Sequence, residues 1–172
     1  SDINASTGSP TVVLRVPHYK LTGNLGLSAS VDFAIPISSG AGAVGFSQFG
    51  FFGSYLISLG SRFSIAPKAG YVISSQSEQA TAIGLSASQP GFGMVMRYNL
   101  GTKYALVLEG LSAGFGSPAI NSHYLFDLSL IRKKESSFGW GLGAKMQSFS
   151  ATSGLGVQRT FSQMLFYAVL CI

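Results

Sequence analysis

The stretch YKLTGNLGLSASVDFAIPI, residues 19–37, decides the fold, because apolar and polar side chains alternate along most of it. Its odd positions carry mainly Leu, Ala, Val, Phe and Ile, whereas its even positions carry mainly Lys, Thr, Asn, Ser and Asp. A period of two residues is typical of a β-strand with one apolar and one polar face. Strands of water-soluble sheets usually span about 3 to 10 residues. This longer alternation therefore predicts one membrane-crossing strand over residues 19–37.

The composition agrees with a membrane location. The chain has 172 residues, enough for one domain, and 47% of them are hydrophobic. Charged residues make up 10%, against about 25% in soluble domains. No segment offers the run of about 20 apolar residues that a transmembrane helix needs. A closed β-barrel, which pairs every backbone group within lipid, is the other way to span a bilayer.

Seven further segments show the same alternation, and the connections between all eight alternate in length. Longer connections are expected at 38–45, 75–90, 114–121 and 150–158, and shorter ones at 60–61, 101–102 and 133–136. Outer-membrane barrels have short periplasmic turns and longer external loops. We therefore predict an all-β fold, an eight-stranded antiparallel up-and-down transmembrane β-barrel of residues 19–172, with both ends on the periplasmic side. Residues 1–18 lack the alternation and are predicted to be an N-terminal periplasmic extension.

In strand number, alternation and loop layout the chain resembles the small eight-stranded outer-membrane barrels of Gram-negative bacteria, the OmpA, OmpX and OmpW types. The resemblance covers residues 19–172 and includes a final strand, residues 161–172. It implies that the protein lies in the bacterial cell outer membrane.

The inward positions of the predicted strands carry most of the charges. They are Lys20, Asp32, Arg62, Lys68, Arg97, Glu109, Asp127 and Lys145. The interior of an eight-stranded barrel is just wide enough for side chains to fill it, and buried charges cost several kcal/mol each unless they are paired. We expect a network of ion pairs that plugs the lumen. A narrow channel that prefers anions is the alternative, because basic residues outnumber acidic ones there.

Large apolar side chains are also expected to face inward on one wall. They are Phe52, Leu56, Leu165, Tyr167 and Val169. We interpret them as a packed layer of the plug. The alternative is an assembly in which barrels contact each other or enclose lipid, since such strands would be apolar on both faces.

Outward aromatic residues gather near the short turns, where they are expected to form a girdle at one membrane interface. They are Tyr19, Phe63, Tyr98, Tyr104, Phe138 and Trp140.

Residues for catalysis or metal binding are sparse. The two histidines are His18 and His123, and Ser122, being adjacent to His123, points to the opposite face of its strand. Asp127 shares the face of His123 but lies about 13 Å away along the strand, beyond hydrogen-bond reach. We therefore expect His123 to form a hydrogen bond in the lumen, with no catalytic residues. One cysteine and two distant histidines offer no zinc site and no cofactor is expected.

The net charge of +5 does not indicate nucleic-acid binding, because most of the excess faces inward or lies in the turn at residues 132–134. We expect a structural or porin-like barrel without enzymatic activity, in contact with membrane lipid or lipopolysaccharide and forming a homo-oligomer that contacts or encloses lipid. An outer-membrane lipid-modifying enzyme, of the lipid A deacylase or acyltransferase type, is the alternative. A soluble β-barrel carrier is a third option.

Overall fold

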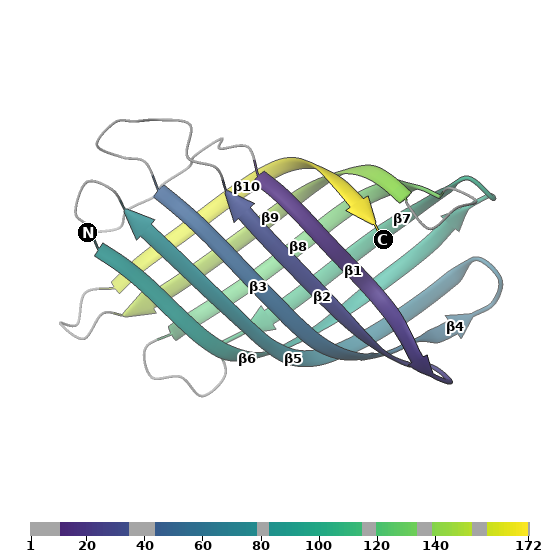
Figure 1. Cartoon of the computed structure of the whole chain (residues 1–172), viewed down its shortest axis with the longest axis horizontal. Helices are drawn as coiled ribbons and strands as arrows, with labels where there is room; N and C mark the ends of the chain where they lie inside the picture. The colour runs from purple at the N-terminus through teal and green to yellow at the C-terminus, as the bar shows by residue number, and fades with distance from the viewer. Residues whose placement is uncertain are drawn as a thin grey trace.

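The computed structural model describes residues 11–34, 44–78, 83–114, 120–133, 139–152 and 158–171. These residues form strands joined by turns (Figure 1). The strands are β1 (Thr11–Thr22), β2 (Leu25–Ala34), β3 (Val44–Tyr55), β4 (Ile57–Leu59), β5 (Phe63–Glu78), β6 (Ile83–Leu100), β7 (Tyr104–Ala113), β8 (Ile120–Arg132), β9 (Gly139–Thr152) and β10 (Gln158–Cys171). No helix of the described residues is long and apolar enough to cross a membrane.

The strands form a nearly closed barrel in up-and-down order, as predicted (Figure 1). Neighbours in sequence pair in antiparallel fashion, and β3 pairs with both β2 and β5. The short strand β4 follows β3 after Leu56 and pairs only with β5. The main wall therefore contains nine strands rather than the predicted eight. The ring closes through a parallel pair, β1 with β10, over three residue pairs from Val13–Val169 to Arg15–Cys171.

The additional strand comes from the stretch that was expected to be a single strand, residues 19–37. The chain reverses at Gly23, whose φ of +54° is readily adopted by glycine, and β2 returns alongside β1. Tyr19 pairs with Leu27 and Thr22 with Leu25, so β1 contains one extra residue before the turn. A two-residue turn alone would move the odd-numbered side chains to the opposite face of the sheet. The extra residue of the bulge moves them back to the first face. The alternation therefore continues through the turn and conceals it.

The barrel also begins earlier than predicted. Residues 11–18, expected to belong to the extension, are part of β1, whereas residues 1–10 lie outside the described residues. The odd-numbered Val13 is buried, but the odd-numbered Tyr19 is exposed, because the register shifts between Val16 and Tyr19. This shift breaks the alternation of inward and outward side chains between residues 16 and 19. With nine strands, β1 starts at the long-connection end and β10 finishes at the short-turn end, so the described ends of the barrel lie at opposite ends rather than at the same end as predicted.

The predicted long connection at 75–90 is also shorter. Strands β5 and β6 stay paired as far as Glu78 and Ile83. Ser and Gln occupy both faces of much of this segment, so the two-residue period is lost while the backbone ladder continues. Turns do occur at the predicted positions around Gly60 and Gly101, both with positive φ.

Candidate functional site

Among the described residues, two ion pairs cross the lumen. The ammonium of Lys68 on β5 lies 2.5 Å from a carboxylate oxygen of Glu109 on β7, and it also lies 4.3 Å from the centre of the Phe52 ring. Lys145 on β9 donates to Asp32 on β2. All four charged side chains are buried, and neither pair joins neighbouring strands. These contacts are consistent with the predicted plug.

Asp127 extends this network. It is fully buried and accepts a hydrogen bond from the phenol of Tyr167. It also occupies a register position between Glu109 on β7 and Lys145 on β9. Five of the eight predicted lumen charges are thus gathered in one buried region.

The other three predicted lumen charges are exposed instead. Lys20, Arg62 and Arg97 lie close to the short turns, where a side chain can reach past the end of the wall. Arg97 donates through Nε to Oδ1 of Asn99 at 3.3 Å. Proximity to a strand end, rather than the inward parity of these positions, decides their environment.

The predicted apolar wall is divided between separate clusters. Phe52 packs with Val72, Leu111, Ala113 and Leu125, whereas Tyr167 packs with Val13. Leu56 packs against a third cluster, formed by Ala66, Val95 and Val107. The strands β1 and β2 separate β3 from β10, so these residues do not share one wall. The side chains of Leu165 and Val169 lie outside the described part of the chain.

Gly143 makes the Tyr167 contact possible. A Cβ at Gly143 would lie 2.5 Å from Cζ of the Tyr167 ring, so the missing side chain leaves room for the phenol to reach Asp127. The group that approaches this glycine closely is thus a side chain of the same protein.

The predicted aromatic girdle lies largely on the outer face. Tyr19, Tyr98, Tyr104 and Trp140 are exposed, and Phe63 is half-buried. The Arg132 guanidinium carbon lies 5.8 Å from the centre of the Trp140 ring. Phe138 is outside the described residues.

Buried polar side chains also lie towards the long-connection end. The amide nitrogen Nε2 of Gln89 is 2.7 Å from Nδ1 of His123, which agrees with a hydrogen-bonding role for this histidine. Both amide atoms of Gln48 and of Gln147 lack a hydrogen-bond partner among the described residues. His18 has no described side chain, and the described residues contain no group of three or more potential metal ligands.

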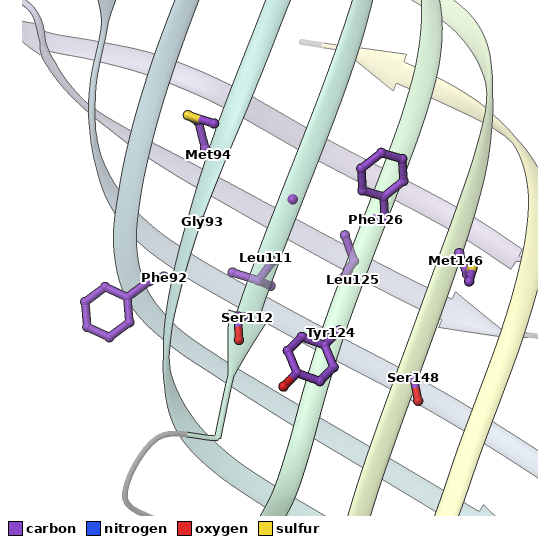
Figure 2. A pocket seen from close by; sticks show the side chains of 11 residues that line it. Phe92, Gly93, Met94, Leu111, Ser112, Tyr124, Leu125, Phe126, Met146 and Ser148 are labelled. Carbon is purple, nitrogen blue, oxygen red and sulfur yellow. The ribbon is translucent and has the colours of Figure 1, made fainter.

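A hollow of about 580 Å³ lies over β6 to β9, and Figure 2 shows its side chains. Phe92 and Met94 of β6 lie on one side, and Tyr124, Phe126 and Met146 of β8 and β9 lie on the other. Between them β7 contributes only Gly110 and Ser112 outward. The hollow is thus an apolar groove along β7, which we call the β7 groove.

The β7 groove was not predicted. The sequence signal was present, because the outward series Tyr104, Leu106 and Leu108 is followed by glycine and serine at the next two outward positions. The depth of the groove depends on side chains of β6, β8 and β9, and their register across β7 is visible only in the folded sheet.

Comparison with protein-family models, with curated proteins and with solved structures gives no match to this chain.

Proposed function

We propose that this protein is an integral β-barrel of the bacterial outer membrane, with a structural role and a lumen closed by its own side chains. One observation carries the proposal: every strand from β1 to β10 exposes a large apolar side chain, whereas five charged side chains of the described residues are buried inside. The largest apolar patch of a soluble monomer is typically about 300–600 Å². A belt that continues around a barrel fits a surface covered by lipid.

The closed lumen favours a structural role over a porin-like one. The two cross-lumen pairs and the Tyr167–Asp127 hydrogen bond occupy the interior together with the three apolar clusters. Breaking a buried ion pair is costly because it leaves an uncompensated charge. These contacts support a lumen that does not open spontaneously.

Reconstitution tests both parts of the proposal. We expect the purified protein to float with phospholipid vesicles and to migrate differently on a gel before and after boiling, as a folded barrel does. In planar bilayers we expect no steady conductance, with a general porin as the positive control. Failure to enter vesicles would contradict the membrane location, whereas steady single-channel conductance would contradict the closed lumen alone.

Lipid-modifying activity and homo-oligomer formation both remain predictions. Lipid A deacylation and acyl transfer can be assayed with the wild type and with His123→Ala, and activity that this substitution removes would favour a lipid-modifying enzyme. Native mass spectrometry in mild detergent would determine whether the barrel forms a homo-oligomer.

A further inference from the structure

Gly110 is a glycine that the fold itself does not require. It lies within β7 without a positive φ, and a Cβ built on it would meet no atom within 4 Å. By contrast, a Cβ at Gly93 or Gly143 would come within 2.6 Å of a neighbouring atom. A glycine inside a strand weakens it by lost entropy and lost packing, and often marks a place where a ligand approaches the backbone.

The β7 groove is apolar, and hydroxyl-bearing residues stand at one of its ends. The register row of Gly110 contains Met94, Phe126 and Met146. The next row towards the long connections contains Phe92, Ser112, Tyr124 and Ser148, three of which carry hydroxyl groups. None of the described residues that line the groove is charged. This arrangement matches an amphiphile without net charge, whose chain lies along Gly110 and whose polar linkage faces the hydroxyl row.

We propose that the β7 groove binds one acyl chain of a net-neutral phospholipid from the surrounding membrane. The chain fills the space above Gly110, between Met94 and Phe126, and its ester group lies near Ser112 and Tyr124. Flexible methionine side chains adapt well to such a chain. The inference rests on the proposed membrane location, because that location supplies the lipid.

The charge of the lining selects between lipids. Lipopolysaccharide carries several phosphates and a net negative charge, which Arg or Lys side chains usually balance, whereas a zwitterionic lipid balances its own phosphate. The groove contains neither residue, so a zwitterionic lipid such as phosphatidylcholine fits better. A second copy of the chain could also cover an apolar groove, and the experiment below separates this outcome.

The chain offers a matched pair of variants. Gly110→Leu fills the groove. Gly53→Leu adds the same side chain to another exposed strand glycine, on β3, whose Cβ would meet only the Ala69 carbonyl oxygen at 3.9 Å. Gly110→Ala is the milder variant, in case the larger side chain disturbs folding.

Mass spectrometry of protein released from phosphatidylcholine nanodiscs would count the lipids that each variant retains. We expect the wild type and Gly53→Leu to retain one lipid. Gly110→Leu should reduce retention by about tenfold or more, which corresponds to the loss of contacts with roughly two methylene groups, and Gly110→Ala should have an intermediate effect. A second sample with equimolar phosphatidylcholine and lipopolysaccharide should still retain phosphatidylcholine.

Several results would overturn the proposal. The wild type could retain no lipid, or Gly110→Leu and Gly53→Leu could retain it equally. The protein could also retain lipopolysaccharide in preference, or form a dimer that only Gly110→Leu dissociates. Vesicle flotation and gel mobility measure the membrane insertion of every variant independently of lipid retention. Proteins that insert normally but hold no lipid contradict the groove alone, whereas proteins that do not insert contradict the proposed function.

Discussion

The two faces of β8 reverse the usual order of a folded protein. Its buried face carries His123, Leu125, Asp127 and Ser129, and its exposed face carries Tyr124, Phe126, Leu128 and Leu130. In a water-soluble sheet the apolar face would be buried and the polar face exposed. The stability of the inner face therefore depends on paired polar groups, whereas that of the outer face depends on the solvent around it. A substitution on the inner face should destabilise the protein by removing a partner, whereas a substitution on the outer face should do so by changing its contact with lipid.

The largest effect is expected from breaking the buried pair on the inner face. Lys145→Met leaves Asp32 buried without its partner, which should lower the free energy of unfolding by about 3–5 kcal/mol. The only tryptophan, Trp140, provides a fluorescence signal for denaturant titrations in vesicles. Lys103→Met, at an exposed turn residue, is the control and should change stability by no more than about 0.5 kcal/mol. Equal stability of the two variants would contradict a paired interior.

A charge on the outer face tests the lipid environment. Leu128→Arg places a cation on the outer face of β8, two residues from the midpoint of the strand, and should cost about 2–4 kcal/mol in vesicles, because the hydrocarbon interior disfavours it. Leu100→Arg, at the short-turn end of β6, should cost about 0–1 kcal/mol. The same denaturant titration measures both. If the two variants were equally stable, the outer face would not lie in lipid.

Gly143 tests how closely the inner face is packed. Gly143→Ala forces the Tyr167 ring to move away from the new Cβ, and overpacking of this kind typically costs about 1–3 kcal/mol. Gly53→Ala adds the same methyl group to the outer face, where only ordinary contact exists, and should be neutral or slightly stabilising, because glycine weakens a strand interior relative to alanine. Thermal unfolding of both variants makes the comparison. A stable Gly143→Ala protein would indicate that the lumen tolerates rearrangement.

The smallest effect concerns the amides at the long-connection end. If water bridges Gln48, then Gln48→Met should lower stability by about 1 kcal/mol, because the substitution removes those hydrogen bonds. A dry, unpaired amide would give the opposite sign, since an apolar side chain of similar shape removes a desolvation cost. Gln147→Met provides an independent repeat on β9. Increased stability of both variants would show a dry interior at this level.

Much of this arrangement could be predicted from local patterns. The parity of side chains correctly identified an antiparallel β-barrel. Five of the charged residues that it places inward, on β2, β5, β7, β8 and β9, are buried, as are Phe52 and Tyr167. A two-residue period reports which face a residue occupies. It carries no information on which inward side chains meet across the lumen, so the pairing of Lys145 with Asp32 needed the structure.

The strand number could not be predicted because two bulges in β1 shift the odd-even phase. One of them conceals the turn at Gly23, and the other disrupts the alternation before Tyr19. The β7 groove was missed for a different reason, since it is a property of four neighbouring strands rather than of one. Exposure of Lys20, Arg62 and Arg97 likewise depends on distance from a strand end, which requires the true strand boundaries.

The parallel pair of β1 and β10 has a consequence for the order of folding. Most other pairs in the wall join successive strands, whereas this one joins Val13 to Val169, 156 positions further along the chain. The entropic cost of closing a loop rises with its length, so contacts of long sequence separation form slowly. The hairpins should assemble first into an open sheet with β1 and β10 as its edges. Three residue pairs among the described residues then close the cylinder, and until that moment both edges can pair with another chain.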